Sequence, residues 1–200
     1  MTDISIQLLG ADHAEAMLRL ASDPELSWTS SVPAVCEAAH VAAWIAENDT
    51  SPRSCLTFAI LDRGVVAGAV TLKRLDASDN SGELSFWVDR EHRGKGLARK
   101  AAELAVDYAF SRLRLDYLHA HCLRDSNPAS RKTLEAVGFT SDKSRSDLPV
   151  EGRFAERFEG DAWAFYRLDH AFAGSAPLIG ANLKRAHQEI EWVNPMGNAA

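Results

Sequence analysis

The stretch Val88-Asp89-Arg90-Glu91-His92-Arg93-Gly94-Lys95-Gly96-Leu97-Ala98 lies between a predicted strand and a long predicted helix. The first turn of a helix has four N–H groups without an intrahelical partner and carries the positive end of the helix dipole. Gly94 and Gly96 have no Cβ, so backbone amides at this turn can approach a phosphate closely. Arg93 and Lys95 add positive charge. The stretch therefore predicts an anion-binding site at the start of a helix.

The same stretch does not match the two common nucleotide-binding motifs. A Walker A loop needs the pattern Gly-x-x-x-x-Gly-Lys-Ser/Thr, and the sequence has no such run. A dinucleotide fingerprint has a third glycine where this chain has Arg99, and it follows the first strand of a parallel unit. Both nucleotide interpretations are therefore weakened. A plain strand-to-helix turn is the other alternative that the motif alone leaves open.

Turn residues and hydrophobic periods predict the elements around this stretch. Strands are expected over residues 5–9, 55–62, 65–75, 83–89 and 116–123, with further strand pieces between 139 and 168. Helices are expected over residues 11–21, 33–48, 94–112 and 128–138, and residues 23–31 are expected to form a loop. A strand, a helix and a strand in series form a right-handed crossover, so strands 83–89 and 116–123 should be parallel. The fold class is therefore α/β, with a mixed, mostly antiparallel sheet.

Length and composition place the chain among ordinary globular proteins. Its 200 residues suffice for one domain with a sizeable core, and 46% hydrophobic with 25% charged residues rules out disorder across the whole chain. No apolar run approaches the roughly 18 residues that span a bilayer. A net charge of −6 disfavours a nucleic-acid binder. The first residues show no secretory signal, and three widely spaced cysteines fit reduced thiols, so we expect a cytoplasmic protein without membrane or nucleic-acid partners.

Several segments, in the right order, resemble the GNAT superfamily of N-acetyltransferases. Residues 91–96 (EHRGKG) are similar to the family's pyrophosphate-binding loop, Gln/Arg-x-x-Gly-x-Gly/Ala, except that Glu91 stands at the first position. Residues 82–88 (GELSFWV) resemble the fourth strand of the RimJ/RimL-type branch. Residues 125–139 (DSNPASRKTLEAVGF) resemble that branch's Asn-x-x-Ser segment, its helix and its Gly-Phe pair. Residues 161–168 resemble its closing strand, so the resemblance covers roughly residues 5–170.

The resemblance implies an acetyl-CoA-dependent N-acetyltransferase whose sheet splays between strands 83–89 and 116–123 and carries helices on both faces. The pantetheine arm of acetyl-CoA, the implied co-substrate, would enter that gap. A backbone N–H at the splay, that of Val88, would hold the oxyanion of the reaction. The pyrophosphate would lie on the backbone amides of Arg93, Gly94, Lys95, Gly96, Leu97 and Ala98.

Three further residues are candidates for catalytic roles. Glu83 could remove a proton from the amine, which is mostly protonated at neutral pH; the alternative is a solvent-facing strand glutamate. Asn127 precedes Pro128 and suits a helix N-cap, while the resemblance also places its side chain near the cofactor or the reacting centre. Ser130 matches a serine of that branch proposed as the acid for the leaving thiolate; the alternative is an ordinary first-turn serine.

The expected reaction is direct attack of a primary amine on the thioester through a tetrahedral intermediate. The amine could belong to a protein N-terminus or to a small molecule, and a non-catalytic acyl-CoA-binding module of the same fold is the alternative function. His119 and His121 lie on one strand face, but two ligands do not complete a zinc site, so no metal is expected. We expect an acetyltransferase domain over residues 1–170, a tail over 171–200 that could dock as a helix, and a homodimer as one assembly.

Overall fold

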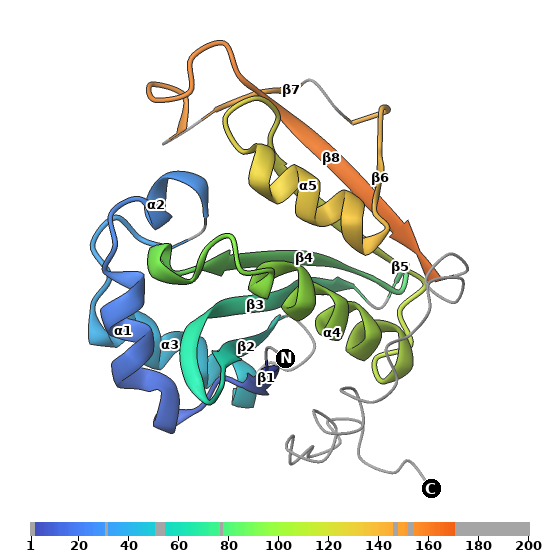
Figure 1. Cartoon of the computed structure of the whole chain (residues 1–200). Helices are drawn as coiled ribbons and strands as arrows, with labels where there is room; N and C mark the ends of the chain where they lie inside the picture. The colour runs from blue at the N-terminus through green and yellow to red at the C-terminus, as the bar shows by residue number, and fades with distance from the viewer. Residues whose placement is uncertain are drawn as a thin grey trace, which may run out of the picture.

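A mixed eight-stranded sheet organises the computed structural model, which describes residues 3–30, 32–50, 55–76, 78–145, 148–151 and 154–170 (Figure 1). The strand order is β1-β2-β3-β4-β5-β8-β6, with β7 paired to β8. The strands are β1 (Ile4–Leu8), β2 (Cys55–Asp62), β3 (Val65–Asp76), β4 (Ser81–Val88), β5 (Tyr117–Leu123), β6 (Thr140–Ser141), β7 (Leu148–Pro149) and β8 (Ala162–Asp169). The helices are α1 (Ala14–Ala21), α2 (Leu26–Thr29), α3 (Ala38–Thr50), α4 (Leu97–Ser111) and α5 (Pro128–Val137), with short 3-10 turns η1 (Ala11–His13) and η2 (Arg90–His92). The predicted tail over 171–200 lies outside the described residues.

The first four strands pair antiparallel in sequence order. β2 and β3 are joined by a tight turn in which Arg63 and Gly64 both adopt positive φ angles, as a type I′ hairpin turn requires. The strand predicted over residues 55–62 has the observed bounds of β2, because its apolar run ends directly at the Asp-Arg-Gly turn.

The parallel pairing of β4 with β5 is short. Ser81, Gly82 and Glu83 pair with the three residues from Tyr117 to His119, and the described structure contains no pairing between these strands beyond Glu83. β8 then pairs antiparallel along the whole length of β5. The expected mixed and splayed sheet is thereby confirmed, with β8 and α5 on one side of the gap and β1 to β4 on the other (Figure 1).

Helices cover both faces of the sheet, as expected. α4 packs on the face formed by β1 to β4, and its predicted apolar stripe is buried; the stripe consists of Leu97, Ala101, Leu104, Ala105 and Tyr108. α1 and α3 cover the opposite face of β2 and β3, where Met17 and Val41 join a second apolar cluster. The two clusters hold the middle strands between helices.

Several element bounds differ from the sequence predictions. The helix predicted over residues 11–21 begins as the 3-10 turn η1, and β4 begins at Ser81 rather than at residue 83. α3 begins at residue 38 rather than 33, and residues 26–29 form the single-turn helix α2 where a loop was expected. α4 begins at Leu97 rather than Gly94, because Gly94 and Gly96 have φ angles of +77° and +81°, which no helical residue adopts.

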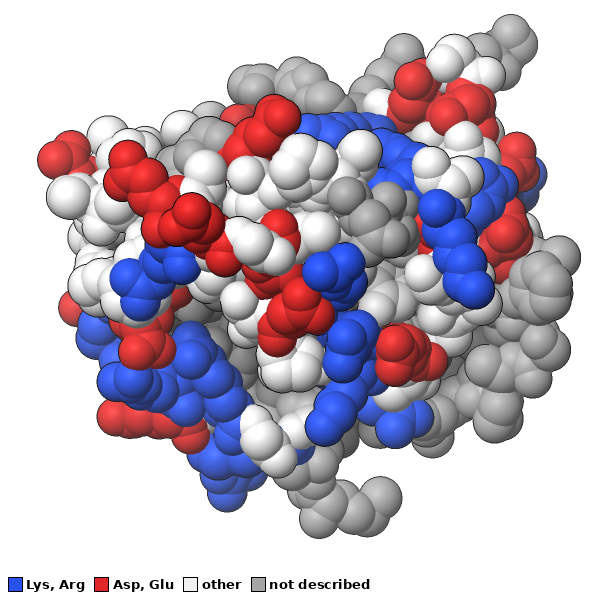
Figure 2. Space-filling view, turned by 90° about the horizontal axis from the view of Figure 1, so that it is seen from above, with Lys and Arg blue, Asp and Glu red and all other residues white. Residues whose placement is uncertain are grey.

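The surface carries charges of both signs. On the face seen from above in Figure 2, Lys and Arg side chains lie among Asp and Glu side chains. None of the helices in the described part of the chain is both long enough and apolar enough to span a bilayer. Across the same residues, no three His, Cys, Asp or Glu side chains gather closely enough to hold a metal ion.

Candidate active site

β4 turns backbone groups toward the gap. The N–H of Asp89 donates to the carbonyl oxygen of Ala67 at 2.8 Å, so these two residues form a hydrogen-bonded pair of the antiparallel β3–β4 ladder. Hydrogen-bonded and non-hydrogen-bonded pairs alternate along such a ladder. Val88, opposite Gly68, therefore points its N–H and C=O away from β3 and toward the side from which β5 has separated. This is the orientation that an oxyanion donor at the splay requires.

The loop after β4 forms an open cradle of backbone amides. A Cβ built on Gly94 or Gly96 would have no heavy atom within 4 Å, so both glycines border open space. Gly96 is the N-cap of α4 and offers no side-chain cap to the first amides of that helix. Unpartnered amides and the positive end of a helix dipole fit the pyrophosphate of a coenzyme A molecule.

A groove of about 600 Å³ runs from this loop past β4 to α5. Most of the expected cofactor-binding residues line it: Val88, Arg93, Gly94, Gly96, Leu97, Ala98 and Asn127. Lys95 is exposed and is not part of the lining. Arg99 does line the groove, although its Nε also donates to Glu103 at 2.9 Å.

The side chain of Arg93 is engaged by protein groups. Its Nε donates to the carbonyl oxygen of Val88 at 3.1 Å, and its Nη1 lies 3.5 Å from a carboxylate oxygen of Glu25. Glu25 also pairs with Arg90 of the same loop. These contacts hold the loop against the end of β4 and against the segment that leads into α2.

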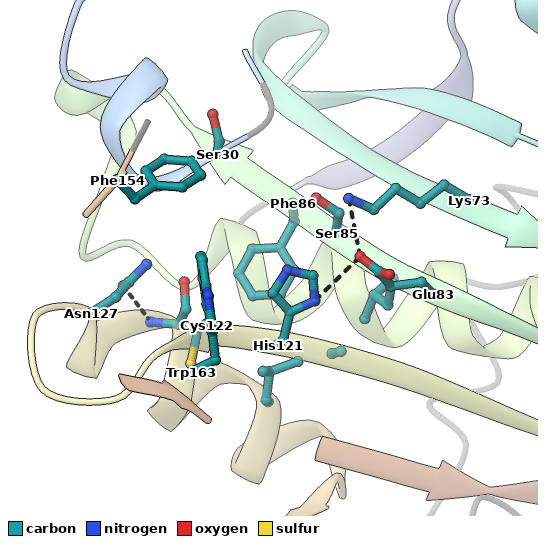
Figure 3. Close-up of a pocket in the computed structure, with 14 residues that line it drawn as sticks. Ser30, Lys73, Glu83, Ser85, Phe86, His121, Cys122, Asn127, Phe154 and Trp163 are labelled. Atoms are coloured by element: carbon teal, nitrogen blue, oxygen red, sulfur yellow. Dashed lines mark hydrogen bonds and ion pairs between the residues drawn. The ribbon is translucent and has the colours of Figure 1, made fainter. Parts of the chain in front are cut away.

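A second cavity of about 170 Å³ lies where β4 and β5 part (Figure 3). Its lining combines charged, polar and aromatic side chains from four strands and from α5, among them Lys73, Glu83, Ser85, Phe86, His121 and Trp163. The cavity and the groove share four lining residues, which are Ser30, Phe86, Asn127 and Ser130. The two spaces therefore meet at the N-terminus of α5.

Glu83 lines the second cavity and is buried, with 6% of its surface exposed. The alternative of a solvent-facing glutamate is therefore wrong. One carboxylate oxygen lies 3.0 Å from Nζ of Lys73 and the other lies 3.2 Å from Nη1 of Arg74. His121 Nδ1 lies 3.4 Å from the first of these oxygens, and the contacts to Lys73 and His121 are dashed in Figure 3. Two basic side chains and an imidazole thus surround one buried carboxylate.

His121 is a candidate functional residue that the sequence analysis did not single out as a base. Burial lowers the pKa of its imidazole, the Glu83 carboxylate raises it, and Lys73, Arg74 and Arg145 lower it further. The net direction is downward, so the ring is neutral near pH 7 and can accept a proton. The available sequence signal was the pair of alternating histidines on a strand predicted to lie beside Glu83.

Asn127 and Ser130 stand at the junction of the cavity and the groove. Asn127 is the N-cap of α5, and its side-chain oxygen accepts a hydrogen bond from the backbone N–H of Ser130 at 3.1 Å. The capping interpretation is therefore confirmed. Because both side chains also line both spaces, the structure leaves Asn127 free to combine capping with a contact to the substrates.

Asp161 anchors the loop that carries this junction. Its two carboxylate oxygens accept hydrogen bonds from the backbone N–H groups of Asp125 (3.0 Å), Ser126 (2.9 Å) and Ala162 (2.8 Å). Burial acts to raise the pKa of Asp161, but these hydrogen bonds outweigh it and lower the pKa to about 2. From the sequence, residue 161 was predicted only as part of the closing strand, because a contact across more than thirty residues leaves no local signal.

Comparisons with known proteins agree with this geometry. The family model described as an acetyltransferase (GNAT) domain matches residues 4–140. YdaF of Bacillus subtilis (strain 168), named provisionally as a ribosomal N-acetyltransferase, is 33% identical over 94 residues, which are 46% of this chain and about half (51%) of YdaF. The crystal structure of spermidine N-acetyltransferase from Vibrio cholerae with CoA and spermine has a TM-score of 0.71 at 18% identity and covers 86% of this chain and 98% of that one. RimL, a ribosomal L7/L12 alpha-N-protein acetyltransferase solved with coenzyme A, has a TM-score of 0.68 at 15% identity, covering 83% and 93%.

Proposed function

The chain belongs to the GNAT acetyltransferase family, and we propose that it transfers the acetyl group of acetyl-CoA to a primary amine. The observation that carries the proposal is the meeting of two spaces at Asn127 and Ser130. One space has the open amide cradle of a phosphate site, and the other has a buried carboxylate beside a neutral imidazole. A thioester reaching the junction from the groove would meet an amine reaching it from the cavity.

Acetyl-CoA is the co-substrate, and its thioester supplies the activated acetyl group. The backbone amides around Gly94 and Gly96 would bind the pyrophosphate, with the dipole of α4 adding to the attraction. The backbone groups that β4 turns toward the gap would hydrogen-bond the pantetheine arm. The role of Arg93 is then to hold the loop in shape, since its guanidinium already contacts Val88 and Glu25.

Glu83 and His121 would remove the proton from the attacking amine. The lowered pKa of His121 supports the imidazole as the group that accepts this proton. Glu83, which the sequence suggested as the base, would act beside it by stabilising the imidazolium that forms. This arrangement resembles the general pairing of a buried carboxylate with a histidine base.

Val88 and Ser130 would serve the tetrahedral intermediate and its collapse. The N–H of Val88 faces the gap and would donate to the oxyanion. The hydroxyl of Ser130 lies at the junction and would donate to the departing thiolate. Direct attack is favoured over an acyl-cysteine route, because burial raises the pKa of Cys122, a cysteine of the cavity lining, to about 11 and keeps it a thiol.

We also propose a family branch, a cellular location and an oligomeric state for the chain. Membership of the RimJ/RimL-type branch is supported by residues 125–139. A reducing, cytoplasmic location is supported by three free cysteines. The homodimer expected from the sequence stays a prediction, which light scattering of the purified chain would measure.

An amine panel tests the function against its alternative, a non-catalytic acyl-CoA-binding module. The purified chain is mixed with acetyl-CoA and with amino acids, peptide N-termini, polyamines and aminoglycosides, and released thiol is followed. Amine-dependent thiol release supports the transferase. Saturable binding of acetyl-CoA by calorimetry with no thiol release from any amine would favour the binding module instead.

A further inference from the structure

A bulge in β3 brings two consecutive basic side chains to one carboxylate. The register between β3 and β4 shifts between Lys73 and Asp76, and Arg74 has a φ of +50°, a left-handed conformation that few residues with a side chain adopt. Neighbouring residues of a regular strand point to opposite faces of the sheet. Here the bulge lets both Lys73 and Arg74 reach Glu83. A strained backbone conformation of this kind persists where contacts of the surrounding structure stabilise it, as the ion pair with Glu83 does here.

Among the described residues, the cavity lining offers no unpaired carboxylate. Glu83 is the single carboxylate among the described lining residues, and two basic side chains already contact it. Lys73 is the one Lys or Arg of that lining, and Arg74 contacts Glu83 from outside it, with 77% of its side chain exposed. An ammonium group beyond the reacting one would find no unpaired carboxylate in this lining, and an unpaired buried charge is strongly unfavourable.

Lys73 has hydrogen-bonding capacity left for a ligand. Its side chain lines the cavity, and its ammonium group has three donors, of which the contact to Glu83 uses one. Arg74 shares the task of balancing Glu83 from the outer side, where its own side chain is largely exposed. An anionic group in the cavity would therefore meet Lys73 without having to displace Glu83 from both of its cations.

Three aromatic rings also line the cavity. Phe86, Phe154 and Trp163 line the cavity, and the ring of Trp163 packs edge-to-face against both Phe154 (5.7 Å between centroids) and His121 (5.2 Å). A cavity of about 170 Å³ with these walls suits one apolar side chain beside the reacting amine.

We propose that the amine acceptor is a small molecule that carries a carboxylate and an apolar side chain, and that Lys73 binds this carboxylate. The proposal rests on the proposed acetyltransferase function and deepens it by naming the acceptor class. It places an amino acid or a close analogue in the cavity, with its amine toward His121. Polyamines, which bring several ammonium groups and no anion, belong to a different class of acceptor.

Four amines with graded charge test the proposal. Initial rates of thiol release are measured with phenylalanine, phenylalaninamide, phenethylamine and spermidine. We expect phenylalanine to have the highest kcat/KM, by about 10-fold to 100-fold over its amide, as one charge-assisted hydrogen bond provides. A higher kcat/KM for the amide or for spermidine would overturn the proposal and leave the transferase intact. No thiol release with any of the four, nor with the wider amine panel, would instead contradict the proposed function and the inference with it.

Variants of Lys73 tie the preference to this side chain. Lys73→Met should remove most of the preference for phenylalanine over phenylalaninamide, and Lys73→Arg, which keeps the charge, should restore part of it. Lys143→Met, on an exposed turn after β6, is the matched control and should keep the wild-type ratio. An unchanged ratio in a folded Lys73→Met protein would contradict the role of Lys73. A carboxylate beside an amine could also come from a protein whose N-terminal residue is Asp, and a peptide amide with Asp at its N-terminus tests this source. A higher kcat/KM for that peptide than for phenylalanine would overturn the assignment to a small molecule.

Discussion

Gly96 and Gly64 have nearly the same backbone conformation, but Gly96 lies in the proposed phosphate-binding loop and Gly64 lies in the turn between β2 and β3. Their φ angles are +81° and +80°, and a Cβ on either would meet no heavy atom within 4 Å. We expect Gly96→Ala and Gly64→Ala each to lower the free energy of unfolding by about 1 kcal/mol through backbone strain. Gly96→Ala alone should raise the Kd for acetyl-CoA, by about 10-fold or more, because its Cβ enters the amide cradle. Thermal melts and calorimetric titrations measure the two effects, and equal Kd values for the two variants would remove Gly96 from the cofactor site.

His121 and His119 form a second matched pair on one face of β5. Burial is the main cause that lowers the pKa of each ring, but only His121 lines the cavity and contacts Glu83. We expect His121→Gln to reduce kcat by about 100-fold or more, in the range found for a lost general base, with little change in the Kd for acetyl-CoA. His119→Gln should stay close to the wild type. Full turnover by a folded His121→Gln protein would leave Glu83, acting alone or through water, as the base.

Among the helices that the sequence predicted, the start of α5 was predicted correctly and the start of α3 was not, and the difference is physical. α5 has an Asn cap before a proline at one end and Gly138 in a left-handed conformation at the other, so both ends are encoded locally. For α3, Pro33 suited a first turn, yet a proline permits a helix start without requiring it. The observed start follows from Glu37, whose carbonyl accepts from the N–H of His40 and whose own N–H donates to the His40 ring.

For the candidate site, the sequence indicated some of the residues but not the residues that contact them. Glu83, Asn127 and Ser130 were named from the family resemblance; the structure brings all three to the second cavity, and their catalytic roles stay predictions. The partners of Glu83 could not be predicted, because strand alternation puts Lys73 and Arg74 on opposite faces and only the bulge reverses this. Long-range anchors such as Asp161 likewise depend on tertiary contacts.

The cap of α5 provides a test at the level of the element. Asp accepts a hydrogen bond from the helix amides as well as Asn does, so Asn127→Asp should keep the melting temperature of the free protein. If the Asn127 amide donates to the cofactor, the same change replaces a donor by a carboxylate and should raise the KM for acetyl-CoA by about 10-fold or more. Asn127→Ala serves as the control that loses the cap and should lower the melting temperature. Unchanged KM in Asn127→Asp would assign Asn127 to capping alone.

The free energy of unfolding of the whole molecule should decrease as the pH is lowered from 7.5 to 5.5. Burial lowers the pKa values of His13, His119 and His121 below 6.5, so below that pH the unfolded chain binds protons that the folded chain does not. The unfolded state is then favoured as the pH falls, until the folded pKa values are reached. Asp161, with its pKa of about 2, contributes only in the far more acidic range below about pH 4. Urea unfolding at the two pH values measures the change, and a stability that rises toward pH 5.5 would contradict these histidine environments.

The short pairing of β4 with β5 gives the molecule an edge inside its own sheet. An exposed strand edge usually invites another chain to pair with it. The shape of the gap protects this edge from pairing with another chain. β4 and β5 are paired up to Glu83 and separate only beyond it, toward the Val88 end of β4. An inserted strand needs about 4.8 Å to each neighbour, so β4 and β5 would have to lie about 10 Å apart along its whole length. Next to Glu83, where the two strands are still paired, they do not. A thin linear ligand can therefore seal the edge where a polypeptide strand cannot, and its arrival would shield the Phe86 and Val88 amides from hydrogen exchange with solvent.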